Sequence, residues 1–465
     1  MTVANDDRST LLRRRSNDLS RSNSPSGNKD RASRFQRMIL SPFGLFLVWV
    51  PLALFLVWEV ITRSVATYLA DARPETAIQL RSTNPTALLN LAEAELKRDQ
   101  ADRNSSAPAK VDPEARTQIR SRAELALRND PLNARAFRIL GQLADRSSNE
   151  EQTERFMQAA GSRSLHESVA VFWMMQKSYQ DGDYHAAIRY ADTLLRTSTY
   201  IAQYVMPMLG KIAENSDASG DLKQLLAGNP PWRLEFFNRL PANISDARTP
   251  LDILLSLKDT PTPPTSAELP SYLNFLITHG FYDLAYYTWL QFLPREQLGT
   301  IGLLFNGDFE VAASGLPFDW TLTQGSGVTI KIGERPDKEG GHALLLDFGV
   351  GRVASLGVTQ LVTLAPGQYR FQGKSNVDIV SQRGLQWRIT CANGEATQLA
   401  ESSVAQGSGG AWQDFSTSFT VPETGCPAQY VRLVFDARSA SEQFISGSVW
   451  YDDLQIVREP IAPNR

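Results

Sequence analysis

The chain has 465 residues, 42% of them apolar, and a formal net charge of −3 at pH 7. This length exceeds the size over which one hydrophobic core keeps growing, so it excludes a single compact domain and predicts two or three domains. The apolar fraction excludes a chain too polar to form packed cores, and the small net charge conceals a basic N-terminal segment.

Residues 1–37 form a basic tail with nine Lys or Arg, from Arg8 to Arg37, against four Asp. The tail is rich in Ser and Asn and has almost nothing to bury, so we expect it to be disordered and cytoplasmic. The run Arg13, Arg14 and Arg15 has two interpretations: an export signal or nucleic-acid patch, or a determinant of membrane topology. The apolar segment that follows favours the second, so we expect no nucleic-acid partner.

Residues 38–61 are predicted to form a transmembrane helix. Met38 to Trp58 contains no charged residue. At ~1.5 Å per residue this segment spans ~31 Å, close to the ~30 Å hydrocarbon core of a bilayer. The alternative is a cleaved signal peptide, because Ser64-Val65-Ala66 fits a small-residue cleavage site. An uncleaved anchor predicts a single-pass protein of the inner (cytoplasmic) membrane, with its N-terminus cytoplasmic and its C-terminal domains periplasmic or extracytoplasmic.

Residues 74–296 have the apolar spacing of amphipathic helices. Phe137, Leu140, Gly141 and Ala144 follow the i, i+3, i+4, i+7 pattern of one helix face. Similar helical stretches recur 34 residues apart along the chain, from Phe137 onward. On these residues the chain resembles the tetratricopeptide-repeat family.

That resemblance implies a solenoid of stacked helix pairs, whose concave face usually binds peptides or proteins. Pro131 is expected to end one unit, and Gly182 and Gly280 are expected to form turns between paired helices. A polar insertion, Asp99 to Asp112, is expected to interrupt the first unit. The resemblance therefore implies a protein partner for this region.

Beyond Phe292 the apolar periodicity changes to two. Apolar and polar residues alternate within 369–374, 385–391 and 414–421, as in half-buried strands. Turn residues such as Pro366-Gly367 separate these strands. Many short strands without a helix predict a two-sheet β-sandwich over residues 303–458.

Several short motifs occur in order within this region: NGDFE from Asn306, FDWTL, VTLAPGQYRFQGKS, WQDFSTSFTVP and VWYDDLQIV. Together they resemble the jelly-roll carbohydrate-binding modules of families four and nine, over about Leu303 to Arg458. The resemblance implies an all-β jelly roll that binds glycan and has NGDFE as its first strand.

In such modules, acidic residues of the first strand and the final Asp pair often hold a structural calcium ion. Carried onto this chain, the candidate ligands are Asp308, Glu310, Asp452 and Asp453, since Ca²⁺ prefers carboxylate and carbonyl oxygens. The alternative is that Asp308 and Glu310 make turn hydrogen bonds and that Asp453 is merely exposed.

The faces of the predicted strands suggest which side chains would contact the glycan. Modules that bind neutral glycans usually expose aromatic side chains, whereas Trp387 lies on the apolar face of its strand and is expected in the core. The opposite faces carry Arg370, Lys374, Arg388 and Arg432. If their strands are neighbours, these cations share one surface that would bind an acidic polysaccharide or an acidic partner, because Arg pairs bidentately with carboxylates. The alternative is a solvated face.

Both cysteines, Cys391 and Cys426, lie in the part of the chain predicted to be translocated. An oxidising compartment would allow them to form one disulfide. The alternative is a reduced, buried pair.

Catalytic motifs are missing: the four histidines have no metal-ligand spacing, and no phosphate loop or nucleophile elbow occurs. We therefore expect no enzyme. The sequence predicts a membrane-anchored, non-catalytic scaffold of the cell envelope, whose solenoid binds a protein partner and whose jelly roll binds glycan, in assembly or export of an extracellular polysaccharide. The alternatives are a glycan-processing enzyme and a purely structural envelope protein.

Overall fold

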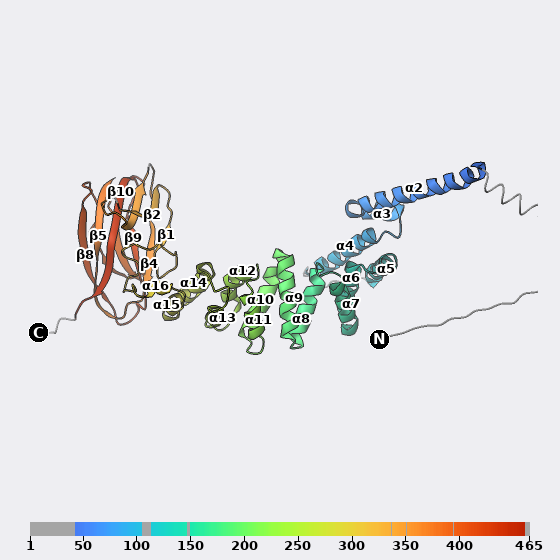
Figure 1. Cartoon of the computed structure of the whole chain (residues 1–465), viewed down its shortest axis with the longest axis horizontal. Coiled ribbons are helices and arrows are strands. Elements are labelled where there is room, and N and C mark those ends of the chain that lie inside the picture. Colours follow the sequence, from blue (N-terminus) through green and yellow to red (C-terminus); the bar gives the residue numbers. More distant parts are fainter. Residues whose placement is uncertain are drawn as a thin grey trace, which may run out of the picture. The chain divides into compact units, whose positions relative to one another are not determined.

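Figure 1 shows the computed structural model of the chain, which describes residues 42–104, 113–146, 149–335, 337–349, 351–393 and 395–460. The chain divides into two compact units, Met1–Leu143 and Ala144–Arg465. The predicted basic tail (residues 1–37) and the first residues of the predicted membrane segment (38–41) lie outside the described residues.

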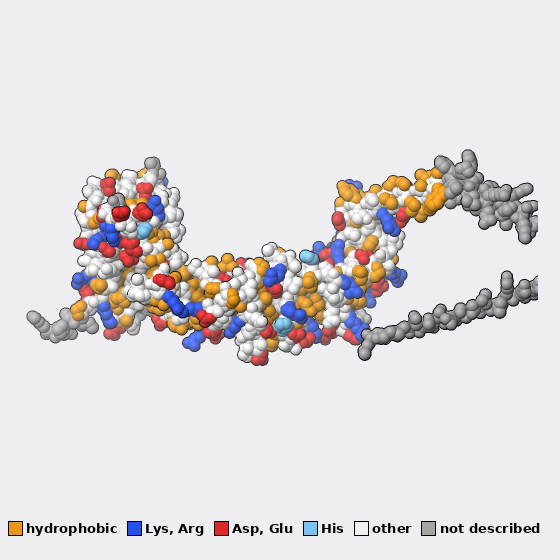
Figure 2. All heavy atoms as spheres, viewed as in Figure 1, with side chains coloured by type: hydrophobic (Ala, Val, Ile, Leu, Met, Phe, Trp, Pro, Cys, Tyr) orange, Lys and Arg blue, Asp and Glu red, His pale blue; other side chains and the backbone are white. Residues whose placement is uncertain are grey.

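The helices that begin in the first unit are α2 (Pro42–Ala72), α3 (Pro74–Leu80), α4 (Pro85–Asn104), α5 (Pro113–Asn129) and α6 (Ala134–Arg146). Within the described residues, α2 contains the one stretch that is long and apolar enough to cross a membrane, Trp49–Ala72. Its apolar side chains are exposed, with Trp58 at 67% and Phe55 at 61% of their free surface, and they cover α2 in Figure 2. The helix continues past the predicted end at residue 61.

The last turns of α2 pack against the next two helices. Ala66 and Ala70 are fully buried on this side of α2. The Asn90 side-chain amide on α4 donates a hydrogen bond to the Ala70 carbonyl (2.8 Å), and Arg81 pairs with Glu59 (2.9 Å). The candidate membrane helix therefore joins the helical unit by direct packing as well as by the chain.

Helix α4 and helix α6 are linked by charged side chains. The Glu93 carboxylate on α4 accepts a hydrogen bond from Arg135 Nε (2.8 Å) and lies 3.4 Å from Arg138 Nη2. Helix α4 runs to Asn104, so residues 99–104 of the expected insertion, Asp99 to Asp112, are helical. Residues 105–112 lie outside the described part of the chain.

The helices of the second unit are α7 (Glu150–Arg163), α8 (Ser168–Gln180), α9 (Tyr184–Thr197), α10 (Ala202–Glu214), α11 (Ser219–Ala227), α12 (Arg233–Arg239), α13 (Thr249–Leu257), α14 (Pro270–Thr278), α15 (Tyr282–Gln291) and α16 (Arg295–Leu298). Short 3-10 helices η1 (Thr199–Ile201), η2 (Leu240–Asn243) and η3 (Ser266–Glu268) lie between them. The predicted helical region is thus confirmed, whereas its identity as tetratricopeptide repeats stays a prediction.

Two helix pairs have the turns expected from the sequence. Gly182 lies between α8 and α9, and Gly280 between α14 and α15, each with a φ of +79° that favours glycine. Asp183 follows the first turn, and its carboxylate accepts a hydrogen bond from the Ala186 amide (2.9 Å), capping α9. Local sequence therefore determines these two turns.

The strands are β1 (Thr321–Thr323), β2 (Val328–Glu334), β3 (His342–Phe348), β4 (Gly357–Val362), β5 (Gly367–Ser381), β6 (Gln386–Cys391), β7 (Gln398–Glu401), β8 (Trp412–Val421), β9 (Gln429–Val434) and β10 (Ile445–Arg458). Within the described residues they form two antiparallel five-stranded sheets: sheet A, in the order β1-β4-β9-β6-β7, and sheet B, in the order β2-β3-β10-β5-β8. The predicted two-sheet β-sandwich is confirmed. Its core includes Trp320 and Trp387, each at most 1% exposed.

The segment NGDFE is not the first strand, contrary to prediction. Asn306 and Phe309 have φ values of +51° and +52°, which are incompatible with a strand. The segment folds as a turn that enters the sandwich: Phe309 is fully buried, the Asn306 carbonyl accepts a hydrogen bond from Trp320 Nε1 (2.8 Å), and the Gly307 carbonyl accepts one from the Leu454 amide (2.9 Å).

The sandwich and the last helices share apolar packing. Trp289 on α15 lies 5.1 Å from Phe305 and 5.8 Å from Phe318, measured between ring centroids. The Tyr282 hydroxyl donates a hydrogen bond to the Ala392 carbonyl. The helices α8 to α15 and the base of the sandwich thus contribute to one hydrophobic core.

Candidate functional site

The outer face of sheet B carries a groove of about 500 Å³. It is lined by Gln372, Gly373, Lys374, Asp414, Phe415, Ser416, Asp453 and Gln455. Alternation along β5 turns Tyr369 and Phe371 into the core and leaves Gln372 and Lys374 on the outer face. Strand pairing then places Gln372 opposite Ser416 and Gln455, and Lys374 opposite Asp414 and Asp452. Carboxamide, hydroxyl and charged groups therefore converge on one surface.

A bulge in β10 shapes this groove. The register with β5 shifts between Asp452 and Gln455, and Asp453 has a φ of +48°. The Asp453 carboxylate accepts a hydrogen bond from the Lys374 ammonium group (2.8 Å). This contact raises the pKa of Lys374. Among the described residues that line the groove, the one cation, Lys374, is therefore already paired with a carboxylate.

Arg335 lies next to the groove and joins separate parts of the face. It follows β2, yet its guanidinium lies over the Trp412 ring of β8, 4.2 Å from the centroid. The same group donates hydrogen bonds to Asp337 (2.7 Å) and Asp452 (2.5 Å). The hydrogen bond from Arg335 lowers the pKa of Asp337.

Two half-buried tryptophans, Trp412 and Trp450, lie on the strands on either side of Asn376. Asn376 on β5 pairs with Trp450 of β10 on one side and Trp412 of β8 on the other. Neighbouring strands lie ~4.8 Å apart, so the two tryptophans are about 10 Å apart across the sheet. The outer face thus combines aromatic side chains with hydrogen-bonding groups.

The predicted cationic surface is wrong, because its four members lie on different sheets. Arg370 and Lys374 are on β5 in sheet B, whereas Arg388 on β6 and Arg432 on β9 are paired opposite one another in sheet A. Which strands become neighbours depends on long-range pairing, which alternation within one strand does not reveal.

Carboxylates or aromatic rings contact each of these cations. Arg370 pairs with Glu459, Arg388 with Glu401 and Asp436, and the Arg432 guanidinium lies 4.1 Å from the Tyr430 ring centroid. The sandwich therefore does not present these groups as one basic patch for an acidic polymer.

Three of the four carboxylates suggested as calcium ligands have other contacts. Glu310 lies 3.1 Å from His342 Nδ1, which lowers the pKa of Glu310. Asp452 and Asp453 bind Arg335 and Lys374, and Asp308 is exposed. In the described ranges no three or more His, Cys, Asp or Glu side chains are grouped to hold a metal ion, so the suggested donor set does not assemble.

Cys391 at the end of β6 and Cys426 before β9 form a disulfide, with 5.1 Å between their Cα atoms. Both residues are buried, at 1% and 5% of their free surface. The bridge joins the end of one strand of sheet A to the segment that leads into its neighbour.

Sequence reasoning missed the groove and the Arg335 stack. The alternation over 369–374 and 414–421 already put Gln372 and Ser416 on the polar faces of their strands, but it did not show that these two residues lie opposite one another. Nothing in the sequence indicated the contacts of Arg335. This residue lies in the connection between β2 and β3, and its partners Trp412 and Asp452 are 77 and 117 residues away along the chain.

No protein-family model matches the chain, and no curated protein matches its sequence. Solved structures that resemble part of it include a family 4 carbohydrate-binding module (15% identity, TM-score 0.25, 34% of this chain and 99% of that chain). A family 16 carbohydrate-binding module has 18% identity and a TM-score of 0.24, over 34% of this chain and 100% of that chain. A family 61 module in complex with beta-1,4-galactotriose has 17% identity and a TM-score of 0.24, over 34% of this chain and 99% of that chain.

Proposed function

We propose that this protein is a membrane-anchored, non-catalytic glycan-binding protein of the cell envelope. The groove on sheet B binds the glycan, the helices bind a protein partner, and α2 holds both at the membrane. Assembly or export of an extracellular polysaccharide is a process that would use such a protein.

The groove of about 500 Å³ on the outer face of sheet B carries the proposal. Gln372, Gln455 and Ser416 offer amide and hydroxyl groups that can donate and accept hydrogen bonds, as the hydroxyls of a sugar require. Lys374 is already paired with Asp453, and Asp414 adds a further carboxylate. The lining thus has no excess of positive charge, which favours an uncharged glycan over an acidic one.

The test is equilibrium binding of the full-length protein, in detergent micelles, to neutral and acidic polysaccharides at low and high salt. We expect binding to a neutral polymer that changes little with salt, because charge attraction contributes little. Replacing both Gln372 and Gln455 with Ala should weaken it by about tenfold or more, since each amide hydrogen bond contributes about 1 kcal/mol. Gln368→Ala, an exposed glutamine on the same strand outside the groove, is the matched control.

Three outcomes would contradict this proposal. Binding to acidic polymers alone, lost at high salt, would support the acidic-polysaccharide expectation. Release of new reducing ends would indicate a glycan-processing enzyme, whose paired carboxylates would be sought first at Asp414 and Asp453. No polysaccharide binding at all would favour the purely structural alternative.

Hollows on either side of Trp173 support the protein-binding part of the proposal. Trp173 on α8 is half-buried and borders one hollow of about 490 Å³ and another of about 360 Å³. Lys177, one turn later, lines both and pairs with Glu150 and Asp181. Site-specific photo-crosslinking from position 173 in intact cells should yield a defined protein adduct. An adduct equally strong from the exposed Leu132 would count against a specific partner.

A further inference from the structure

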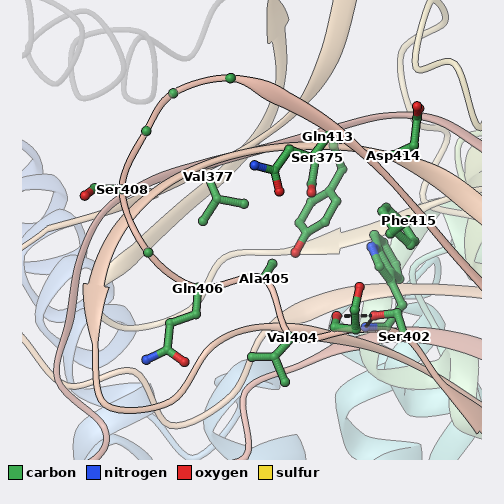
Figure 3. A pocket seen from close by; sticks show the side chains of 17 residues that line it. Ser375, Val377, Ser402, Val404, Ala405, Gln406, Ser408, Gln413, Asp414 and Phe415 are labelled. Atoms are coloured by element: carbon green, nitrogen blue, oxygen red, sulfur yellow. Dashed lines mark hydrogen bonds between the residues drawn. The ribbon is translucent and has the colours of Figure 1, made fainter.

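The sandwich contains a hollow of about 130 Å³ beneath the loop from Ser402 to Ala411, shown in Figure 3. Beside it lie two polar atoms, Trp387 Nε1 and the Tyr451 hydroxyl, that have no hydrogen-bond partner in the part of the chain that the structure describes. Both rings are only 1% exposed, so a ligand in the hollow would not reach these atoms. Helix α2, by contrast, carries an open apolar surface.

Helix α2 is longer than a bilayer is thick. Its 31 residues extend ~46 Å at ~1.5 Å per residue, against ~30 Å for the hydrocarbon core. Glu59 is the first charged residue of the helix, and it binds Arg63 (3.1 Å) and Arg81 (2.9 Å). With the apolar residues up to Trp58 in the bilayer, as proposed above, residues 59–72 of α2 stand outside it.

A stripe of apolar side chains runs along this outer part of α2. Ile61, Val65 and Tyr68 are 52%, 42% and 84% exposed, and Leu54 and Trp58 continue the stripe into the membrane segment at 65% and 67%. The steps between successive members alternate between four and three residues, which is the heptad pattern of a coiled coil. Most residues between them outside the bilayer are polar: Glu59, Thr62, Arg63, Ser64 and Thr67. The stripe is therefore a distinct face of the helix.

The stripe does not face the helices that pack on α2. Figure 1 shows α3 and α4 on one side of α2, where Ala66 and Ala70 are fully buried. At ~3.6 residues per turn, these two alanines lie roughly a third of a turn from the middle of the stripe. A second helix can therefore lie against the stripe without displacing α3 or α4.

We propose that this stripe pairs with the same stripe of a second copy of the chain, as a parallel coiled coil that continues from the membrane. The pairing rests on the membrane anchor proposed above, because two copies anchored in one bilayer have the same orientation. Parallel helices with one heptad pattern place equal positions side by side, so Ile61, Val65 and Tyr68 each meet their counterparts. The stripe is thus complementary to itself.

The part of the stripe that faces water is small. An aromatic side chain buries ~150–250 Å² in a core, so Ile61, Val65 and Tyr68 together leave roughly 250 Å² in water per copy. Two copies would cover roughly 500 Å², below the ~1,000 Å² of a specific interface between soluble proteins. Two chains anchored in one membrane meet at a higher effective concentration, which offsets the small area. The pairing therefore belongs to the membrane-bound protein.

The test is cysteine crosslinking of the full-length protein in the membranes of the cells that produce it. Both native cysteines are already joined in a disulfide, so one added cysteine supplies one free thiol. After mild oxidation, Ile61→Cys, Val65→Cys and Tyr68→Cys should each give a band near twice the 51.6 kDa of the chain on a non-reducing gel. Val60→Cys and Thr67→Cys, at exposed positions off the stripe, are the matched controls. They should give little or none of this band, because a disulfide requires Cα atoms within ~7 Å.

Adding Val65→Glu to Ile61→Cys should abolish the band, whereas adding Thr67→Glu should leave it. Equal bands at stripe and control positions would indicate random collision, and adducts of another mass at the stripe would indicate a different protein. Either result, or no band at the stripe, would overturn the pairing. Extraction with alkaline carbonate tests the anchor separately. A chain that carbonate releases disproves the anchor and the pairing with it, whereas a chain that stays in the membrane without a stripe band disproves the pairing alone.

Discussion

Arg335 and Trp412 are stacked on the outer face of sheet B, with the guanidinium carbon 4.2 Å from the centroid of the ring. The guanidinium also binds Asp452, whose side chain is only 4% exposed. One side chain from the connection between β2 and β3 thus fixes an aromatic ring on β8 and neutralises a buried carboxylate on β10.

Arg335→Ala should destabilise the sandwich by about 3 to 5 kcal/mol, because it leaves the buried Asp452 carboxylate without its partner. Differential scanning calorimetry of the full-length protein should show a lower midpoint for the sandwich transition. Adding Asp452→Asn to Arg335→Ala should recover part of the loss, since the amide removes the unpaired charge. Lys331→Ala, which removes an exposed cation on the same face, is the control. If Lys331→Ala lowers the midpoint as much as Arg335→Ala does, the loss of the Arg335–Asp452 pair is not the cause.

Reduction of the Cys391–Cys426 bridge should also destabilise the sandwich. The two residues are 35 positions apart in the sequence, and closing a loop of this length is worth about 4 kcal/mol in the chain-entropy model. Thermal unfolding with and without a reductant gives the difference. A variant with both cysteines changed to Ala should unfold at the temperature of the reduced wild type. Its unfolding temperature should be the same with and without the reductant. If the reductant also lowers the unfolding temperature of this variant, the destabilisation does not come from the Cys391–Cys426 bridge.

Glu93 should make the first unit sensitive to acid. Burial alone would raise the pKa of Glu93, but the charges and hydrogen bonds of Arg138 and Arg135 outweigh it, so the pKa falls below its ordinary value of 4.5. The folded state then binds this proton less tightly than the unfolded state, and the stabilisation present above pH 4.5 is lost as the pH falls through the folded pKa.

Glu93→Gln should therefore lower stability at neutral pH and remove part of the loss on acidification. Unfolding followed by circular dichroism at neutral pH and at a pH below 4.5 measures the change for wild type and variant. Glu124→Gln, at an exposed position on α5, should behave like the wild type at both pH values. A wild type and a Glu93→Gln variant with parallel pH profiles would disprove the role of this carboxylate.

Local patterns in the sequence predicted the elements whose cause is local. The helical turns at Gly182 and Gly280 require a left-handed residue, and the strand that contains Trp387 follows from alternation, so both were predicted. The turn at Asn306 was misread as a strand, because two non-glycine residues there adopt positive φ, which sequence seldom signals.

Contacts between distant strands were not predictable from one sequence. Arg370 and Arg388 look alike within their strands, yet pairing places them on different sheets. The groove likewise depends on the bulge at Asp453 and on the register between β5, β8 and β10. Register is a property of the folded sheet as a whole. Alternation therefore identified the inner and outer face of each strand, but it did not show which residues of different strands lie next to one another.

The orientation of the chain in the membrane is open to a direct test. Nine Lys or Arg precede the apolar segment, so the positive-inside rule predicts that residues 1–37 stay in the cytoplasm and that the chain after α2 lies on the other side. Alkaline phosphatase fused after residue 460 should be active, and a green fluorescent protein that folds only in the cytosol should be dark at the same position. Fusions after residue 37 should give the reverse pattern. A C-terminal fusion that fluoresces would place the sandwich in a reducing compartment, where the bridge between Cys391 and Cys426 would not persist and an external glycan would be out of reach.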